Sequence, residues 1–376
     1  MQRPAFTVGI EEEYLLVERD SRDLVRDPPP ALWEELQSAL GEQVGSEFMR
    51  SQVEIQTVVC ESITDAAKDL RYLRRTVCDI ADRHGLAPIA ASTHPFASWD
   101  QQLHTDKERY NLLARDMQGV VRRMLISGMH VHVGIEDPDL RIDLMNQVSY
   151  FLPHLLALST SSPFWSGKDT GLKSYRMSVF RSLPRTGLPE HFEGWAEYER
   201  HIDVLVGAGI FEDATKVWWD IRPSARYPTL ELRIPDICTH VDDGITIAAL
   251  YLSLLSMLFR KRKNNQRWRT YSNFLISENV WRAQRYGISE DLMDFGRGEL
   301  VSMDVLTQEL VTLLAQDAEL LDCKAEIEHV REIMKHGTSA DKQLDVYEKA
   351  LVANRDEDSS LNRVVDFLID ETRRGL

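Results

Sequence analysis

The residues most able to do chemistry in this sequence lie on short strands that carry carboxylate, imidazole and guanidinium groups. In GIEEEY (residues 9–14), the strand period of two places Glu11 and Glu13 on one face and Glu12 on the other. Two neighbouring carboxylates repel each other and are costly to bury unless protons or a cation hold them together. Carboxylate oxygens at this spacing suit Mg²⁺ or Mn²⁺, although a solvated sheet face would explain the motif taken alone.

Three further segments place metal-binding or phosphate-binding side chains on one strand face and apolar side chains on the other. These residues are Glu54 in QVEIQ (52–56), His130 and His132 in SGMHVHVG (127–134), and Glu231 and Arg233 in TLELRIPD (229–236). Each motif alone has an ordinary structural alternative, such as an exposed histidine or a cross-strand ion pair. Their occurrence in four separate strands favours a polar sheet floor suited to nucleotide and metal chemistry.

Apolar alternation predicts the strands that must position these side chains. The predicted strands span residues 6–17, 49–58, 87–92, 125–135, 217–221 and 229–234. Residues 161–174 and 181–190 are rich in turn-forming residues and are predicted to be loops, which near a site often act as lids.

Helical patterns lie between the strands and dominate the second half of the chain. Ser62 is predicted to cap a helix that runs to about Arg83, and Pro138 to begin a helix that continues past residue 150. From about Asp242 to the C-terminus the pattern is helical, with no further strand. We therefore expect a single catalytic domain over residues 1–376, with a strand-bearing core to about residue 240 and a mostly helical part after it.

The composition is that of a folded protein with 376 residues, of which 43% are hydrophobic and 28% charged. A formal net charge of −16 disfavours nucleic acid and anionic membrane as partners. The apolar segment 244–259 is shorter than the ~20 residues that a bilayer requires and is predicted to be a buried helix. The four cysteines form no CxxC pair, and the N-terminal segment has no signal-peptide pattern, so we expect a cytoplasmic protein.

The ordered set GIEEEY, SGMHVHVG and LELRIPD, within roughly the first 235 residues, resembles the type 2 glutamate–cysteine ligase family, also called carboxylate–amine ligases. The segments MHVH and ELRIPD are further similar to glutamine synthetase. This resemblance implies an α+β, glutamine-synthetase-like fold. Its curved, mostly antiparallel sheet would form the active-site floor, packed with helices, and a helical C-terminal half would follow.

The same resemblance implies roles for individual residues. The metal ligands would be Glu11, Glu13, Glu54, His130 and Glu231. The nucleotide would be contacted by His130, His132, Arg222 and Arg233, and substrate carboxylates by Arg176 and Arg222. Glu231 and Arg233 would be the catalytic pair, with Arg233 contacting the transferred phosphoryl group or the substrate carboxylate through two parallel hydrogen bonds.

The mechanism that the resemblance implies has two steps. ATP, with Mg²⁺ or Mn²⁺ as the metal cofactor, phosphorylates a substrate carboxylate to an acyl phosphate, and an amine then displaces phosphate. In the family the usual substrates are glutamate and cysteine, so amino acids and ATP are the implied partners. A homodimer or larger assembly is expected for an enzyme of this type.

Two other functions remain open from the residues. A zinc or di-metal hydrolase could use His130, His132 and the glutamates, although the arginine beside Glu231 weighs against it. Such an enzyme would work without nucleotide. A nucleotide-binding protein without turnover would be stabilised by Mg·ATP but would release no ADP.

Overall fold

Seven strands form the central sheet in the computed structural model, which describes residues 2–376. The strand order is β10-β11-β5-β1-β3-β2, with β4 also paired to β1, and every pairing is antiparallel. The bounds are β1 Val8–Glu18, β2 Val44–Ser46, β3 Gln52–Gln56, β4 Leu86–Ile89, β5 Met129–Gly134, β10 Ile221–Pro223 and β11 Thr229–Leu232. The expected mostly antiparallel sheet is confirmed.

On the face of β1 that carries Glu11 and Glu13, the two halves of the strand are covered differently. Farther along the same face, Leu15 and Val17 are fully buried in a second hydrophobic cluster. This cluster also contains residues of the C-terminal helix α14 (Glu357–Arg373), which contacts β4. The first half of the face therefore stays open for chemistry, and the second half anchors the C-terminal helix.

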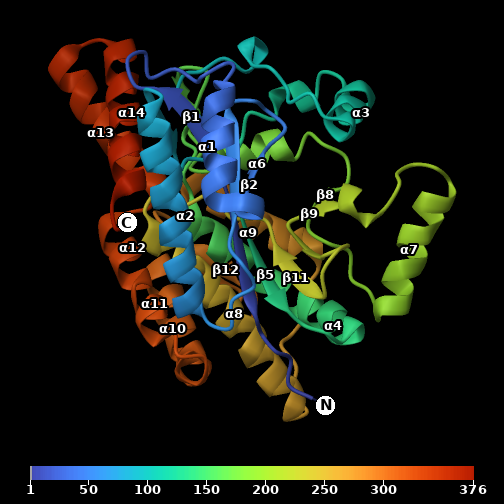
Figure 1. Cartoon of the computed structure of the whole chain (residues 1–376). Helices are drawn as coiled ribbons and strands as arrows, with labels where there is room; N and C mark the ends of the chain where they lie inside the picture. Colours follow the sequence, from blue (N-terminus) through green and yellow to red (C-terminus); the bar gives the residue numbers. More distant parts are fainter. Residues whose placement is uncertain (1) are drawn as a thin grey trace.

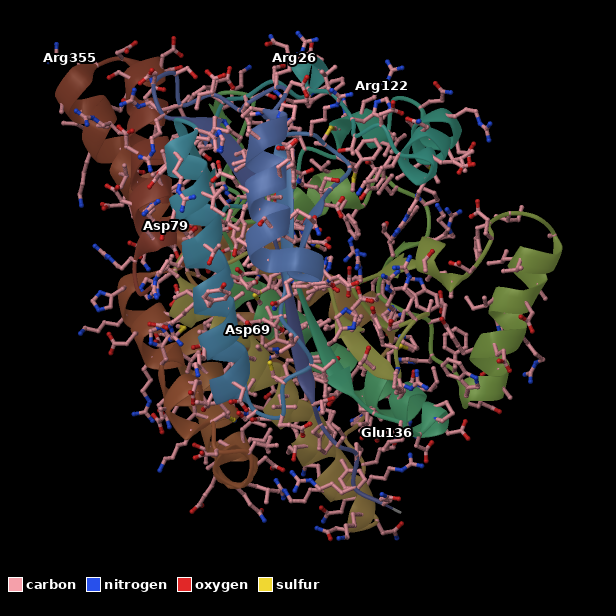
Figure 2. The ribbon with its side chains drawn as sticks, viewed as in Figure 1. Arg26, Asp69, Asp79, Arg122, Glu136 and Arg355 are labelled. Atoms are coloured by element: carbon pink, nitrogen blue, oxygen red, sulfur yellow. The ribbon has the colours of Figure 1, made fainter. Side chains whose placement is uncertain are left out.

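The opposite sheet face is covered by long helices, as Figure 1 shows. They are α2 (Ile63–Arg83), which contacts β1, α4 (Pro138–Val148), which contacts β10 and β11, and α8 (Val241–Lys263), which contacts β5. Ser62 caps α2 by accepting a hydrogen bond from the Asp65 backbone N–H, as the sequence predicts. Charged side chains such as Arg26, Asp79 and Glu136 lie on the outside of these layers (Figure 2).

Helix α8 is long and apolar enough to cross a membrane by length and composition. However, 94% of its most apolar window is buried inside the protein, against the sheet and the helices α4 and α5 (Leu152–Ser159). The prediction of a buried helix over 244–259 is confirmed.

The remaining helices complete the outer layers. They are α1 Pro30–Leu40, α3 Glu108–Met117, α6 Tyr175–Phe180, α7 Trp195–Gly207, α9 Asn273–Tyr286, α10 Met303–Leu320, α11 Lys324–Glu328, α12 Val330–His336 and α13 Ser339–Asn354. Short 3₁₀ turns span Gly41–Gln43, Trp99–Gln101, Val121–Arg123, Ser149–Phe151 and Ala214–Lys216. Helices α3 and α7 project on the side away from α13 and α14 (Figure 1).

The expectation of no strand after about Asp242 is wrong. Strands β12 (Leu292–Asp294) and β13 (Glu299–Val301) form an antiparallel hairpin there. Its connection includes Gly298 with a φ of +73°, which favours glycine. Each strand has three residues, too few for alternation to stand out in a helical context.

The two predicted loops contain short strands of their own. Strands β6 (Phe164–Trp165) and β7 (Lys168–Asp169) pair within 161–174, and β8 (Thr186–Gly187) lies within 181–190. The predicted strand 217–221 is divided into β9 (Trp218–Trp219), which pairs with β8, and the first residue of β10.

A buried ion pair fixes β1 from behind. The Glu12 carboxylate accepts from Arg74 Nε at 2.6 Å and Nη2 at 2.7 Å, and both side chains are fully buried. Arg74, on α2, also donates to the carbonyl oxygens of Cys238 and Thr239, each at 2.8 Å. Every charge is thus compensated inside the core, and β1 is joined to α2 and to the start of α8.

Replacing Arg74 with methionine is expected to lower the free energy of unfolding by about 3–5 kcal/mol, because the buried Glu12 carboxylate would lose its cation and keep the Tyr14 hydroxyl as a donor. Urea denaturation followed by circular dichroism measures this. Arg83→Met on the same helix is the control, since Arg83 pairs with Glu35 at the surface and its loss should cost at most about 1 kcal/mol. A loss for Arg74→Met no larger than the control would contradict the expected role of the buried pair.

Candidate active site

The register of the central sheet brings the predicted residues onto one floor. Glu11 lies opposite His130 on β5 and opposite Gln56 on β3. Glu13 lies opposite Glu54. On the other side of β5, Glu231 lies opposite His132 and opposite Arg222. Side chains from five strands therefore face the same space.

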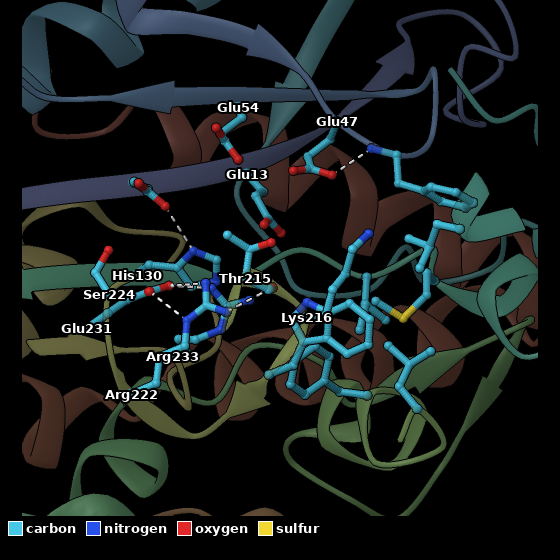
Figure 3. A pocket seen from close by; sticks show the side chains of 18 of the residues that line it. Glu13, Glu47, Glu54, His130, Thr215, Lys216, Arg222, Ser224, Glu231 and Arg233 are labelled. Atoms are coloured by element: carbon cyan, nitrogen blue, oxygen red, sulfur yellow. Dashed lines mark hydrogen bonds and ion pairs between the residues drawn. The ribbon is translucent and has the colours of Figure 1, made fainter. Parts of the chain in front are cut away.

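This space is a cavity of about 310 Å³ over the sheet. All nine residues that the sequence predicts for the site line it: Glu11, Glu13, Glu54, His130, His132, Arg176, Arg222, Glu231 and Arg233. Figure 3 shows Glu13, Glu47 and Glu54 directed toward one another, with His130, Glu231 and the arginines beside them. The structure therefore brings the predicted polar side chains of the four strands together in one cavity. The roles of these residues remain predictions.

Three carboxylates form an acidic cluster in the cavity. Oxygen atoms of Glu13, Glu47 and Glu54 lie within 4.8 Å of one another. Burial, reinforced by the charge of Glu47, raises the pKa of Glu13 to about 8 despite opposing contacts with Arg176 and the Gly128 N–H. Burial and the neighbouring carboxylates also raise the pKa of Glu54 well above its usual range. The cluster therefore holds protons in the absence of a cation.

The acidic cluster fits a divalent cation by its chemistry. Buried carboxylate oxygens that repel each other are stabilised when Mg²⁺ or Mn²⁺ replaces the protons, and these ions prefer such hard oxygen donors. Glu13, Glu47 and Glu54 would hold the ion. Sequence reasoning missed Glu47, which follows β2 and belongs to no alternating pattern; only strand pairing brings it beside Glu54.

Glu11 lies between the two histidines of β5. Its carboxylate contacts His130 Nδ1 at 3.1 Å and His132 Nε2 at 3.4 Å. Burial would raise the pKa of Glu11, but the hydrogen bonds with both histidines outweigh it and hold the pKa well below its usual range. Glu11 is therefore ionised, unlike Glu13.

The two histidines have opposite protonation tendencies. Burial, aided by the charge of Arg233, lowers the pKa of His130 to about 4. Burial also acts to lower the pKa of His132, but the hydrogen bond with Glu11 and the charge of Glu231 outweigh it, so this pKa is raised. Neutral His130, with Nδ1–H donating to Glu11, presents the lone pair of Nε2, the arrangement usual for a metal-binding imidazole.

Glu231 lies between two guanidinium groups. Its oxygens accept from Arg222 Nε at 2.8 Å and Nη2 at 3.2 Å, and from Arg233 Nη1. Burial alone would raise the pKa of Glu231, but the charges of Arg233 and Arg222 hold it well below its usual range. These bonds fix the orientation of both guanidinium groups. The carboxylates of the acidic cluster are Glu13, Glu47 and Glu54, so a role for Glu231 as a metal ligand stays a prediction.

Arg233 retains a donor for a ligand. Its Nε is buried and has no hydrogen-bond partner within residues 2–376. A buried unpaired N–H is costly, and an anionic oxygen in the cavity would satisfy it. Arg233 is therefore the arginine best placed to bind a phosphoryl or carboxylate group.

Arg222 and Arg176 are held by the protein more tightly than the sequence suggests. Arg222 Nη1 donates to the carbonyl oxygens of Thr215 and Val217. Arg176 donates to the carbonyl oxygens of Arg233 at 3.0 Å and Ile234 at 3.1 Å. Both line the cavity, yet the Arg176 bonds hold the backbone at Arg233 and the Arg222 bonds hold the segment before β9. Substrate binding by either residue stays a prediction.

Because Glu13 is protonated up to about pH 8 without metal, a bound cation must displace that proton. We expect the Mg²⁺-induced rise in melting temperature to be small at pH 6 and several-fold larger at pH 8.5. The metal-free protein should lose stability over the same interval, since a carboxyl with a raised folded-state pKa stabilises at low pH and loses that contribution as pH rises through about 8.

Differential scanning fluorimetry with and without Mg²⁺ checks this pH dependence. Glu13→Gln should flatten the profile, whereas the control Glu34→Gln, at an exposed position of α1, should leave it unchanged. A Mg²⁺ effect that is equal at both pH values would contradict the proton displacement.

Residues 7–366 match the family described as glutamate–cysteine ligase family 2. A protein of Rhodospirillum rubrum, provisionally named glutamate–cysteine ligase 2, is 59% identical over 376 residues, covering 99% of this chain and 97% of the relative. A protein of Jannaschia with the same provisional name is 52% identical over 366 residues, covering 97% and 96%.

Two crystal structures are similar in fold. The bifunctional glutathione synthetase of Pasteurella multocida gives a TM-score of 0.68 at 14% identity, covering 98% of this chain and 53% of that one. A glutamate–cysteine ligase of Francisella tularensis in complex with AMP gives 0.65 at 14% identity, covering 100% and 90%. Likeness at this identity shows the fold alone, and the expected α+β, glutamine-synthetase-like fold class is confirmed.

Proposed function

The chain belongs to glutamate–cysteine ligase family 2, and from this premise we propose that it is an ATP- and Mg²⁺-dependent ligase that activates an amino-acid carboxylate as an acyl phosphate. Membership makes it a carbon–nitrogen ligase of the carboxylate–amine type. One observation carries the proposal: the acidic cluster and Arg233 line the same cavity. Phosphoryl transfer requires positioning and charge neutralisation, and this floor offers groups for both.

In the first step an oxygen of the substrate carboxylate forms a bond to the γ-phosphorus of ATP as the bond to ADP breaks. A divalent cation held by the acidic cluster would neutralise phosphate charge. The Arg233 guanidinium donates to the oxygens that gain charge, with Glu231 fixing its plane by accepting at Nη1. No serine or cysteine nucleophile is needed.

In the second step the amine nitrogen attacks the acyl carbon, inorganic phosphate leaves and the amine loses a proton. The amide bond replaces the acyl–phosphate bond, so the overall products are amide, ADP and phosphate. Glu11, kept ionised by His130 and His132, keeps a negative charge on the floor at neutral pH and can accept a hydrogen bond from the attacking amine.

A structure of similar fold also supports a nucleotide here. The Francisella tularensis enzyme was crystallised in complex with AMP. In this chain we place the nucleotide at the end of the cavity formed by His132, Ser224 and Tyr227. His132 is held there by Thr229 Oγ1 at 2.9 Å and packs edge-on to the Tyr227 ring.

A screen of amino-acid pairs for Mg·ATP-dependent release of ADP tests the function, with mass spectrometry identifying the amide. ADP release that needs both amino acids supports the ligase. Turnover without nucleotide would favour the hydrolase instead, and stabilisation by Mg·ATP without any ADP would favour the binding protein. We also propose a homodimer or larger assembly, which light scattering tests.

A further inference from the structure

The cavity has a second end that differs in chemistry from the sheet floor. Figure 3 shows hydrocarbon and aromatic side chains on the side of the acidic cluster opposite Glu231 and Ser224. The apolar side chains of the cavity wall are Phe48, Leu113, Val121, Met124, Ile126, Phe180, Leu183 and Trp218. A polar active-site floor therefore continues into an apolar compartment, which we call the apolar end.

The apolar end is built from segments that are far apart in the sequence and packed on the two smaller hydrophobic clusters. Phe48 and Val121 are buried members of one cluster, while Ile126, Phe180 and Leu183 are buried members of another. Met124 packs against both. This wall is consequently anchored by the protein core.

The polar groups near the apolar end are mostly turned to the protein. The Tyr110 hydroxyl donates to the Ser46 carbonyl oxygen at 3.3 Å, and its ring meets Phe48 edge-on at 5.7 Å between centroids. The Arg176 guanidinium lies over the Phe180 ring and is bonded to carbonyl oxygens. A substrate group entering here meets rings and hydrocarbon rather than hydroxyls.

Two cations at the edge of this compartment have no ion-pair partner in the described part of the chain. They are Arg109 on α3 and Lys216, which precedes β9, and both line the cavity. Arg222 and Arg233 are bonded to Glu231 and Arg176 to the backbone, while Arg226 belongs to the end of the cavity with Ser224 and Tyr227. At the apolar end, Arg109 and Lys216 are therefore the cations free to bind an additional carboxylate.

We propose that the amine substrate is an α-amino acid whose side chain is apolar and larger than that of cysteine. Its side chain would fill the apolar end, its carboxylate would meet Arg109 and Lys216, and its nitrogen would face the acidic cluster. Each methylene buried there adds about fourfold in affinity, from ~0.8 kcal/mol per group. This inference rests on the proposed ligase function for its reaction but makes a separate claim about binding.

The test uses two readouts on the full chain. The first is kcat/KM for ADP release with glutamate as carboxylate donor and serine, 2-aminobutyrate, leucine or phenylalanine as amine. The second is calorimetric binding of the same amines in the presence of Mg²⁺, glutamate and a non-hydrolysable ATP analogue. We expect both to rise with apolar size, with leucine at least tenfold above serine.

Two variants of helix α3 distinguish an effect on the apolar end from a general effect on the helix. Leu113→Asn should lower kcat/KM and affinity for leucine about tenfold while changing those for serine less than twofold. Leu112→Asn, a neighbouring half-buried position outside the cavity wall, should leave both unchanged. Both substitutions place the same residue in α3, so helix propensity cancels.

The outcomes are distinguishable. If no amino-acid pair releases ADP, the proposed function fails, and the calorimetric series then decides the inference alone. Binding that does not increase with apolar size overturns the inference even if ADP appears. A rise in the KM for ATP rather than for the amine in Leu113→Asn also overturns it, because the apolar end would then hold adenine.

Discussion

Glu13→Gln is expected to reduce Mg·ATP-dependent ADP release by at least about 100-fold, the scale on which removing one preorganised charge-stabilising contact acts. The substitution keeps the shape of the side chain and removes its charge from the acidic cluster. The cation would lose a negative ligand and, with it, the neutralisation of phosphate charge. Steady-state ADP release at saturating ATP measures the effect.

The fold should survive this change, which distinguishes loss of chemistry from loss of structure. Because burial raises the pKa of Glu13 to about 8, the metal-free variant should be at least as stable as the wild type at pH 8. Glu18→Gln, at the exposed end of the same strand, is the control and should retain activity. Wild-type turnover in Glu13→Gln would remove this residue from the catalytic floor.

Arg233→Lys is expected to lower kcat by about 100-fold to 1000-fold, with a smaller change in KM for ATP. Lysine keeps the positive charge but not the planar group that bonds Glu231 and offers Nε to a ligand. The interaction lost is one that strengthens as the phosphoryl group transfers, so kcat should fall more than binding. Rapid-quench measurement of ADP formation locates the loss in the chemical step.

A matched exchange at the surface controls for the lysine itself. Arg200→Lys, on the exposed face of α7, should change kcat by less than twofold. If Arg233→Lys behaved the same way, Arg233 would be a structural partner of Glu231 and another group would have to meet the phosphoryl oxygens.

The floor of the site could be predicted from the sequence because it depends on local periodicity. His130 and Glu231 alternate with apolar residues that must be buried, and the strand period places Glu11 and Glu13 on the face opposite Ile10, Glu12 and Tyr14, so the faces were fixed before any pairing was known. The order GIEEEY, HVHVG and LELR then indicated the family, which the match over residues 7–366 confirms. The buried helix α8 was predictable in the same way.

The rest depends on contacts between distant segments. Glu47 lies beside Glu54 only because β2 pairs with β3. Arg109 and Lys216 line the cavity because the fold brings α3 and the turn before β9 to it. The hairpin β12–β13 has strands too short for a periodic signal. The hydrogen bonds of Arg176 and Arg222 to backbone carbonyl oxygens could not be predicted, because a sequence does not show which carbonyl groups lack partners.

The three consecutive glutamates of β1 have a consequence for how this gene can change. Glu11 and Glu13 look onto the cavity, whereas Glu12 is held in the core by Arg74. Inserting or deleting one residue directly before Glu11 would exchange the two faces, placing two carboxylates against one guanidinium and leaving one in the cavity. The length of this segment is therefore as constrained as the identity of its three glutamates.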